Sequence, residues 1–552
     1  MKRNYRTNFW KFLILVFAIG FTQCMQDEYD FDKLSTEMEI NGGIITPVGY
    51  GSLSIDNLIS KLDSSSSEFL NEYEDGLLYI TYKDSIGSFT ASDLISMPDQ
   101  DFFQYFIESD SDFPANPWLA SDTMRVERTE LFDITFENNE RLDSIILDAA
   151  NLQIESSSTF LHTGQIIITC PSIKKNGISF SDSVQISSST GTYTDISNFA
   201  LDGYTIEIDN TTNPDTSFIP VNFIIELYNS GNPINSGDRI DINATIHNID
   251  FSSTFGYIGD YELVSEEGSV ELGFFDDFID GDFEFADPQI NINISNSYGI
   301  PVAATINNFK GYTETDSMAL SFEPGVNPFR IAYPSLAEYG ETKDTILSIN
   351  AVNSDIEDLL AFLPTEIKYN ISAASNPDGP GASYNFVNNN SKLDLDLEVI
   401  LPLWFKANIM AFEDTIEFDI SDETDKIDMI NNLSVLLVVD NGIPFEINIQ
   451  GTLTDSLYNE INTLFDPSSL PVIEGATIGA DGKVSESTSK KSSISYDKNA
   501  IDELKDVRYI IITARIKTSD YSNNTMVKFY NNYSIDFNLG LDIDYNLNPD
   551  NL

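Results

Sequence analysis

The chain has 552 residues, of which 29 are Lys or Arg and 88 are Asp or Glu, so its formal net charge at pH 7 is −59. Such a charge repels nucleic acid phosphates and anionic lipid head groups, which argues against a nucleic acid partner. Disorder is disfavoured as well, because 41% of the residues are hydrophobic and 37 Phe and 25 Tyr supply enough apolar surface for folded cores.

The first residues have the features of an export signal. Basic residues precede an uncharged and mostly apolar run from Phe12 to Phe21. A helix needs about 20 apolar residues to span the hydrocarbon core, so this run is too short for a permanent anchor. We therefore expect residues 1–23 to be a signal peptide that is removed from the mature protein.

Cys24 follows this apolar segment closely. The arrangement resembles the lipobox of bacterial lipoproteins, in which the cysteine is diacylated and becomes the first residue of the mature chain. Two or three acyl chains would hold the protein on a membrane, since each buried methylene contributes about 0.8 kcal/mol. Phe21, Thr22 and Gln23 depart from the usual Leu, small residue, and Gly or Ala, although Bacteroidota lipoboxes are looser. An ordinary secretory signal with an incidental cysteine is the alternative.

The residues after Cys24 indicate which way an anchored protein would face. Gln26, Asp27 and Glu28 resemble the short acidic export signal of surface-displayed lipoproteins of the Bacteroidota. The resemblance implies a location on the outer membrane, facing the cell exterior. A solvated acidic tether is the simpler explanation of the same residues. In either case we expect residues 24–45 to form a linker.

Beyond this tether, the pattern predicts an all-β fold made of tandem β-sandwich modules. Thr46 to Lys61 predicts an extended segment followed by one short amphipathic helix with Ser54 as its N-cap. Most of the remaining chain consists of short runs of β-branched and aromatic residues, bounded by Asn, Asp, Gly, Ser and Pro. Ile356 to Phe362 and Asp455 to Phe465 are candidates for further helices.

One corner recurs between the predicted strands. A strand ends in Asn, passes a Gly and a Pro, and resumes as a strand at Asn296 to Pro301 and at Asn441 to Pro444, with a looser third instance at Asn229 to Pro233. Gly permits positive φ in such a turn, and Pro as the first residue of a strand removes no ladder hydrogen bond. We interpret these as equivalent corners of related modules. The corner resembles that of late-embryogenesis-abundant type β-sandwiches, and immunoglobulin-like sandwiches also fit the strand pattern.

The domain boundaries follow from composition. An acidic segment from Phe275 to Asp287 precedes the first clear corner. We therefore expect an N-terminal β-rich region at residues 46–285 and a C-terminal β-sandwich region at residues 286–552. The Gly-, Pro- and Asn-rich segment 375–391 is a candidate for a further division of the second region.

A triplet of Asp, then Ser or Thr, then an apolar residue also recurs. Turn chemistry explains it if the Asp bonds the backbone where the chain enters a strand. The triplet is also similar to the O-glycosylation acceptor of exported Bacteroidota proteins, and both interpretations hold together because turns are accessible. The candidate acceptors are Ser85, Thr123, Ser144, Ser183, Ser317, Thr345, Thr415 and Ser456.

Calcium is the metal that this composition favours, because hard oxygen ligands are abundant and softer ligands are scarce. The densest acidic cluster contains Asp276, Asp277, Asp280 and Asp282, without the spacing of an EF-hand. A solvated acidic loop is the alternative. No other cofactor is expected.

Cysteine and histidine usage disfavours several kinds of catalytic site. Cys170 alternates with Ile166 and Ile168, which predicts a buried core position. His162 and His247 are the two histidines of the chain and are far apart in sequence. A zinc site and a Ser-His-Asp triad are therefore both disfavoured.

The function that these features predict is that of a non-catalytic binding or scaffold lipoprotein of the outer membrane. Its partner would be a glycan or another envelope protein, and the chain resembles Bacteroidota lipoproteins of unknown role. One alternative is an extracellular carbohydrate-active enzyme that uses a carboxylate pair, since acidic residues are abundant. A second alternative is a lipid-binding envelope protein, which would need a long apolar groove inside a sandwich.

Overall fold

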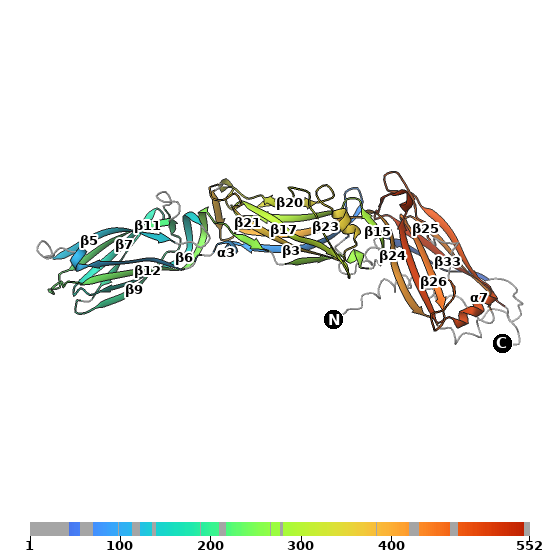
Figure 1. Cartoon of the computed structure of the whole chain (residues 1–552), viewed down its shortest axis with the longest axis horizontal. Helices are drawn as coiled ribbons and strands as arrows, with labels where there is room; N and C mark the ends of the chain where they lie inside the picture. The colour runs from blue at the N-terminus through green and yellow to red at the C-terminus, as the bar shows by residue number, and fades with distance from the viewer. Residues whose placement is uncertain are drawn as a thin grey trace, which may run out of the picture.

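A computed structural model of the chain describes residues 44–55, 70–95, 97, 99–112, 122–134, 140–187, 189–208, 217–264, 267–276, 280–381, 384–418, 430–463 and 473–545. The molecule is elongated, with three β-rich modules arranged end to end (Figure 1). We call them the insert, middle and terminal modules. The prediction of an all-β fold built from sandwich-type modules is confirmed.

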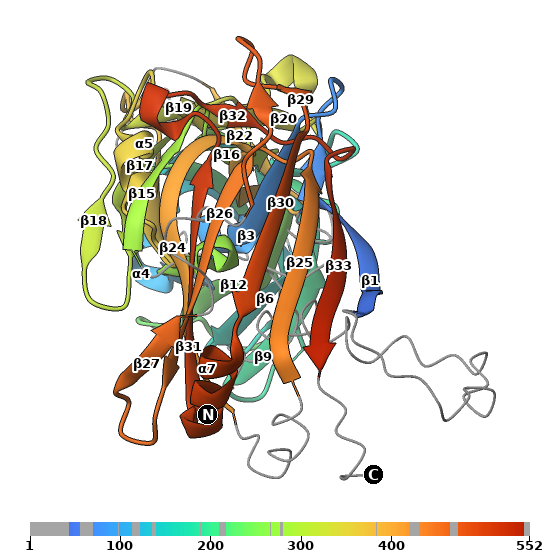
Figure 2. The same cartoon turned by 90° about the vertical axis from the view of Figure 1, so that its right-hand side faces the viewer.

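The terminal module contains strands from both ends of the described chain. Its first sheet has the order β1 (Ile44–Ser54), β33 (Ser534–Tyr545), β25 (Ile430–Asn441) and β30 (Thr488–Tyr496), which lie side by side in Figure 2. Its second sheet has the order β15 (Asp280–Phe285), β24 (Trp404–Glu417), β31 (Tyr509–Thr518), β26 (Phe445–Thr454) and β27 (Glu460–Thr463), with β32 (Val527–Lys528) paired to β24. Helix α7 (Lys498–Glu503) precedes β31, and β28 (Thr477–Ile478) pairs with β29 (Val484–Glu486).

The middle module has the same two-sheet construction. One sheet has the order β2 (Leu70–Glu72), β3 (Leu78–Thr90), β23 (Lys392–Pro402), β16 (Gln289–Asn296) and β20 (Lys343–Ile349). The other has the order β13 (Glu262–Val264), β21 (Glu366–Ser375), β17 (Val302–Tyr312) and β18 (Ser317–Ala319), with β14 (Gly268–Glu271) beside β21 and β19 (Phe329–Ile331) beside β17. Helix α3 (Ala91–Leu94) follows β3, and α5 (Ile356–Ala361) precedes β21.

The insert module is built on a ten-stranded sheet that contains nine strands of its own and one from the neighbouring module. One layer consists of β4 (Gln100–Glu108), β12 (Arg239–Tyr257), β6 (Arg141–Ser158) and β9 (Tyr193–Ala200). The other consists of β5 (Thr123–Ile134), β11 (Ser217–Tyr228), β7 (Thr163–Lys175) and β8 (Ile178–Ile186), and β10 (Thr205–Glu207) bridges β6 and β7. A single turn, α4 (Ser109–Asp112), follows β4, and β22 (Asn385–Asn388) of the neighbouring module adds to β12.

The modules are nested in the chain rather than consecutive. β1 pairs with β33 and β3 pairs with β23, so the chain gives β1 to the terminal module and β2 and β3 to the middle module, builds the insert module, and then returns to complete the sheets of the other two modules. The division expected at residue 286 falls between β15 and β16, which lie in different sheets. The regions before and after it nevertheless share sheets. The sequence could not reveal this, because strand alternation specifies a strand but not its partner.

The middle and terminal modules repeat one topology. The order β3-β23-β16-β20 in one corresponds to β1-β33-β25-β30 in the other, and the pair β21-β17 corresponds to β31-β26. In both modules a short helix, α5 or α7, precedes the corresponding strand, β21 or β31. Corresponding strands also keep the same register, since Ala304 opposes Ala373 where Ile447 opposes Ile516.

The two Asn corners join equivalent strands and use the same hydrogen bonds. The side-chain oxygen of Asn296 accepts from the backbone N–H of Tyr298 at 2.9 Å, and that of Asn441 accepts from Ile443 at 2.8 Å. Both Asn side chains are fully buried, and each amide group donates to a backbone carbonyl of another loop at 3.0 Å or less. The interpretation of equivalent corners is therefore confirmed for these two. The third corner, at Asn229, makes the same local bond to Gly231 at 3.0 Å but connects two strands of the insert module.

The role expected for the corner glycines was wrong in two of the three cases. Gly231 has a φ of 85°, as the turn argument requires. Gly299 and Gly442 do not have positive φ; instead a Cβ on Gly299 would lie 2.2 Å from the Phe386 ring, and one on Gly442 would lie 2.9 Å from the Ser534 carbonyl oxygen. Close approach of neighbouring chain, and not backbone conformation, requires glycine at these two corners.

A cluster of phenylalanines fills the junction between the middle and terminal modules. Phe405 stacks on Phe283 at 4.7 Å and on Phe529 at 4.8 Å between ring centroids. Phe274 reaches this cluster from the end of the middle module, and its backbone N–H donates to the Tyr82 hydroxyl of β3 at 3.0 Å. Aromatic pairs of this kind add about 0.5–1.5 kcal/mol each to the burial of their area, so the junction resists bending.

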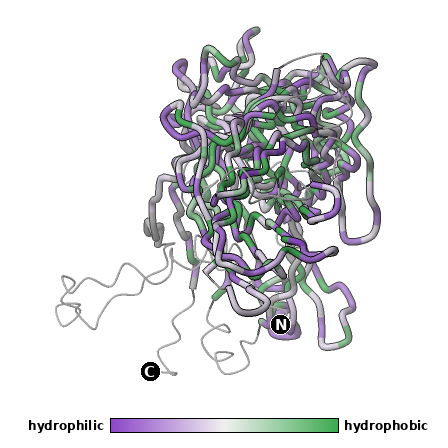
Figure 3. Tube along the Cα trace, turned by 90° about the vertical axis from the view of Figure 1, so that its left-hand side faces the viewer, coloured by the Kyte–Doolittle hydropathy of each residue, from purple (hydrophilic) through white to green (hydrophobic). Residues whose placement is uncertain are grey.

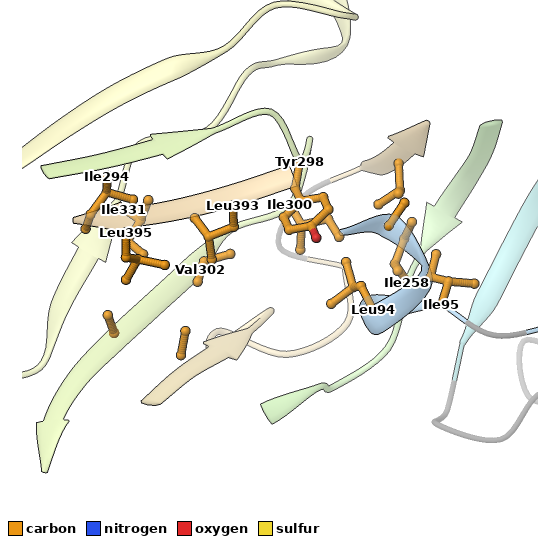
Figure 4. Close-up of a cluster of buried hydrophobic side chains, with 14 of the residues drawn as sticks. Leu94, Ile95, Ile258, Ile294, Tyr298, Ile300, Val302, Ile331, Leu393 and Leu395 are labelled. Carbon is orange, nitrogen blue, oxygen red and sulfur yellow. The ribbon is translucent and has the colours of Figure 1, made fainter. Parts of the chain in front are cut away.

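The junction between the insert and middle modules is equally continuous. β22 pairs with β12 over four residues from each strand. The buried side chains at this end of the middle module include Leu94, Ile95, Ile258, Tyr298 and Ile300, which gather between α3 and the first corner (Figure 4). β12 leaves the insert module through Gly256, where a φ of 127° and a carbonyl 2.5 Å from an added Cβ both require glycine.

Two local predictions have different outcomes. Ile356 to Phe362 contains α5, so that helix is confirmed. The described part of Asp455 to Phe465, which ends at residue 463, does not form the expected helix, because Asp455 accepts from the backbone of Leu457 and Asn459 and closes a turn between β26 and β27. The extended part of Thr46 to Lys61 lies in β1, and the helix predicted after Ser54 lies almost entirely outside the described residues.

Candidate functional site

The insert module presents two flat outer faces with different chemistry. On the face of β5, β11, β7 and β8 the polar side chains bond one another across the strands. Glu226 accepts from Arg125 at 3.2 Å and from Gln165 at 2.7 Å, and Gln185 donates to Gln165 at 3.2 Å. Because these groups bond one another, a partner that binds them would have to break or share these bonds.

The opposite layer carries what we call the amide face. It consists of the outward side chains of β4, β12, β6 and β9, and alternation along each strand points them away from the core. Amides are interspersed there with charged and hydroxyl groups, and two large apolar side chains lie on opposite sides of the face. Its amides are Gln104, Asn151, Gln153, Asn198 and Asn243, its apolar groups are Phe106 and Ile196, and its other central groups are Glu155 and Thr245.

Three features make the amide face a candidate for binding. Phe106 and Ile196 are 50% and 55% exposed, although apolar groups of this size usually pack. The register places Asn243 between Gln104 and Glu155, near the middle of the face. The buried side-chain oxygen of Asn243 has no hydrogen-bond partner among the described residues. Such a face can exchange hydrogen bonds with hydroxyl or amide groups of a ligand and contact its apolar surface.

Charged groups lie at the margins of the amide face and are mostly paired. Arg239 bonds to Asp241 and also lies 4.6 Å from the centroid of the Phe106 ring. His247 lies 3.2 Å from the Asp99 carboxylate, and this hydrogen bond, with a second one from the Asn248 backbone, lowers the pKa of Asp99. The centre of the face is therefore neutral except for Glu155.

Cys170 and His162 are both part of the packing of the insert module. Cys170 is fully buried, and desolvation raises the pKa of its thiol to about 12, so the prediction of an inert core cysteine is confirmed. His162 is also fully buried; its Nδ1 accepts from the backbone N–H of Ser230, and burial lowers its pKa. Neither residue has the exposure that a nucleophile or its base requires.

The residues predicted to anchor and export the protein, Cys24, Gln26, Asp27 and Glu28, lie outside the described residues, so their roles stay predictions. Within the described part of the chain, no helix combines the length and apolarity needed to cross a bilayer.

The predicted calcium site is only partly described. Asp277 lies outside the described residues, and of Asp280 only the backbone is described. Asp276 is exposed next to the Phe274 turn, whereas the Asp282 carboxylate accepts from the Tyr521 hydroxyl at 2.9 Å. Among the described residues no group of three or more His, Cys, Asp or Glu side chains is placed to hold a metal ion. Calcium therefore stays a prediction.

A carboxylate with a raised pKa lies at the junction of the middle and terminal modules. Desolvation raises the pKa of Glu357, on the first turn of α5, and the negative charges of Glu284, Asp358 and Asp287 raise it further. Glu357 is exposed, however, whereas the carboxylate-pair alternative requires two carboxylates at a fixed distance in a cleft. Glu284 itself forms an ion pair with Lys406 at 2.7 Å, which favours a structural role for it.

The Asp-Ser/Thr triplets mostly do not begin strands, contrary to the turn interpretation. Only Thr123 and Ser317 stand at the first residue of a strand in the described chain, and Ser85 lies beside a bulge within β3. The interpretation depended on local pattern alone, whereas pairing with distant strands extended the flanking segments. Among the acceptor candidates, Ser85, Thr123, Ser317, Thr415 and Ser456 are exposed, and Ser144, Ser183 and Thr345 are half-buried. Glycosylation at these sites stays a prediction.

Comparisons with known proteins name no family. No family model and no curated protein matches the chain. The chain is similar to a solved structure from Parabacteroides distasonis described as a secreted protein, at 16% identity and a TM-score of 0.28, covering 53% of this chain and 90% of that one. A triple jelly roll protein of an archaeal virus matches at 9% identity and a TM-score of 0.10, covering 81% and 97% of the two chains. These scores are too low to support an inference about function.

Proposed function

We propose that the protein is an exported, non-catalytic binding or scaffold lipoprotein, anchored to the outer membrane through Cys24 and facing the cell exterior. In this proposal the three modules act as a rod that carries the insert module away from the membrane. The export features of residues 1–28 support the anchor, and the direction of the chain through the modules supports the rod.

The direction of β1 is the observation that carries the proposal. Its Ser54 end lies next to the middle module, because the following residue, Ile55, donates to the Tyr533 carbonyl, close to the bridge between Leu77 and Tyr530. The other end of β1, at Ile44, opposes Ile543 near the far end of β33. Ile44, the first residue that the structure describes, therefore lies at the end of the terminal module that points away from the middle module.

The length of the rod determines how far the amide face would lie from the membrane. β1, β3 and β6 have 11, 13 and 18 residues and belong to successive modules. At about 3.3 Å per residue, strands of this length in three modules end to end span on the order of 100 Å. An anchor at Cys24 would hold the amide face at roughly that distance from the bilayer, where it could meet a neutral glycan or a second envelope protein.

The anchor is tested by fractionation of cells that produce the Cys24→Ala variant. The variant is expected to leave the membrane fraction, whereas Cys170→Ala, which changes a buried core residue, should stay membrane-bound. Retention of the Cys24→Ala variant on the membrane would overturn the anchor.

The binding role is tested with substitutions on the two faces of the insert module. Phe106→Ala together with Ile196→Ser should weaken capture of glycans on an array, or of an envelope partner by cross-linking, by about tenfold or more. Leu131→Ser, which changes a side chain that is 63% exposed on the opposite layer, is the matched control. Equal behaviour of the two variants would remove the amide face from the proposal.

A further inference from the structure

One layer of the insert module ends in an edge strand, β9, that pairs on one side. Its residues, Tyr193–Ala200, all oppose residues of β6 in a register without a bulge, and no other strand of the described chain pairs with it. Figure 3, in which the insert module faces the viewer, shows hydrophobic and hydrophilic residues interspersed along the described chain, as strands with one buried side require. β9 departs from this pattern at Ile196, a large apolar side chain that points outward and is 55% exposed.

The backbone of β9 has hydrogen-bonding groups on its open side. The N–H of Leu201, the residue after β9, donates to the Ala150 carbonyl of β6 at 2.8 Å. Hydrogen-bonded residues alternate along an antiparallel ladder, so the unbroken register directs the backbone N–H and C=O groups of Thr194, Ile196 and Asn198 away from β6. Within the part of the chain that the structure describes, these groups have no backbone partner. An open row of this kind is a template for another strand.

The other long strands that stand last in a described sheet carry features that hinder such pairing. β5 is rich in charged residues, β30 has two adjacent lysines, and β1 contains Pro47 and an irregular register. β4 has a register shift, and in β8 the Asp182 carboxylate already accepts from the Ser183 N–H at 2.8 Å. β9 has no Lys, Arg, Pro or Gly, and its one charged residue is Asp195. β9 is therefore the edge that is open to pairing.

We propose that β9 pairs in antiparallel orientation with β9 of a second copy of this chain. A two-fold axis at Ile196 would place this residue opposite itself, so that the two outward isoleucines pack together and their backbones exchange hydrogen bonds. The same axis places Thr194 opposite Asn198 of the second copy. Each outward N–H of Thr194, Ile196 and Asn198 then meets an outward carbonyl oxygen of the other strand.

The remaining side-chain pairs of this register are compatible. Tyr193 would meet Phe199 of the second copy; both pack partly buried against the core, and cross-strand aromatic pairs are favourable. Asp195 would oppose Ser197, whose hydroxyl donates to Asp195 within one copy at 2.9 Å. Like charges therefore do not face each other across the two strands. At about 0.15 M salt, charges separated by more than about 8 Å are largely screened, which limits the repulsion between two chains of net charge −59.

Antiparallel pairing would join two rods head to head. The Gly256 end of β12 pairs both with β22 of the middle module and with the first residues of β6, whereas β9 pairs with the last residues of β6. β9 thus runs along the rod in the half of the insert module that is far from the middle module (Figure 1). Two paired copies would point in opposite directions. This step rests on the proposed function, since anchors at Cys24 would then lie in two facing membranes.

The test uses the mature chain with Cys24→Ala, in which Cys170 is fully buried, so that a cysteine introduced on β9 is the reactive thiol. The Ile196→Cys variant should form a disulfide-linked dimer on mild oxidation, because the Cα atoms of the two copies would be about 5.5 Å apart. Asn198→Cys is the matched control, exposed on the same face of the same strand, but its two copies would lie about 14 Å apart. Non-reducing electrophoresis should show dimer formation about tenfold or more faster for Ile196→Cys.

A second measurement tests the register by charge. Sedimentation equilibrium of the parent chain at about 100 µM should show monomers and dimers. Thr194→Lys together with Asn198→Lys should weaken the dimer by about tenfold or more, because positive charges would oppose each other across the two strands. Thr194→Lys together with Asn198→Glu should restore it, because each introduced positive charge would then oppose a negative one.

Equal cross-linking of the two cysteine variants would overturn the proposal, and so would equal behaviour of the two charge variants. A parent chain that stays monomeric at about 100 µM would overturn it too, and is the result expected if the open edge takes a strand from a different protein. These measurements contain no membrane and no glycan, so their failure leaves the anchor and the amide face untouched. Retention of the Cys24→Ala variant on membranes would likewise leave the pairing untouched.

Discussion

The middle and terminal modules share one topology and differ in how deeply they bury matched side chains. Both have a corner with a buried Asn, both pair a strand that precedes the insert module with their last strand, and both keep the same register between central strands. Ile292 in the middle module nevertheless has no exposed surface, while its counterpart Leu437 is half-buried. The difference indicates that two modules with the same corners and strand order can bury matched side chains to different depths.

The most direct test of this difference in burial is to remove side-chain volume at matched positions of the two modules. Ile292→Ala should lower the free energy of unfolding by about 3–4 kcal/mol, since it removes contacts in a fully packed core and leaves a cavity. Leu437→Ala should lower it by about 1 kcal/mol, because part of that side chain already contacts water. Chemical denaturation followed by circular dichroism measures both. Equal losses would show that the terminal module is as closed as the middle module.

Substitutions at the Asn corners test whether the middle and terminal modules are stabilised in the same way. Asn296→Ala and Asn441→Ala should each lower the free energy of unfolding by about 2–3 kcal/mol, because each leaves buried backbone groups without their partners. Asn229→Ala, at the exposed third corner, should cost no more than about 1 kcal/mol. If only one of the two buried corners proves sensitive in denaturant titrations, they are not energetically equivalent.

A smaller effect is expected on the pH dependence of the middle module. The hydrogen bond and charge of Lys343, with two bonds from Ser335, lower the pKa of Glu338 from 4.5 to about 2. A lowered carboxyl pKa stabilises the folded state above the ordinary value, and this contribution is lost as the pH falls from about 4.5 towards 2. Glu338→Gln should therefore flatten the pH dependence of the melting temperature in this range. An unchanged profile would contradict the assignment.

Much of this architecture could be predicted from the sequence. The all-β class follows from short alternating runs, and the Asn corners were recognised because Asn, Gly and Pro each have a distinct backbone effect. α5 was predicted from a different signal, since Ile356, Leu359 and Leu360 repeat with helical spacing. The helix predicted to begin at Asp455 was wrong, because the Asp455 carboxylate closes a turn there and leaves the side chains of Leu457 and Tyr458 exposed.

The nested order and the candidate sites could not be predicted in the same way. Pairing of β3 with β23 joins residues about 300 positions apart in the chain, and alternation carries no information about such partners. The amide face was missed because outward polar residues are usual on any sandwich. Its signal was the repeated choice of amides, as in Asn151 and Gln153 on β6 and Asn243 on β12. The open edge of β9 depends on strand order, which only the assembled structure contains.

Small-angle X-ray scattering of the mature chain with Cys24→Ala tests the central claim most directly, because the proposed function depends on a rigid rod with the insert module at the pole opposite the N-terminal segment. A compact chain of this length would have a radius of gyration of about 24 Å. The nested rod predicts a value above about 30 Å, with a largest dimension on the order of 100 Å or more. A radius near that of a compact chain would contradict the account.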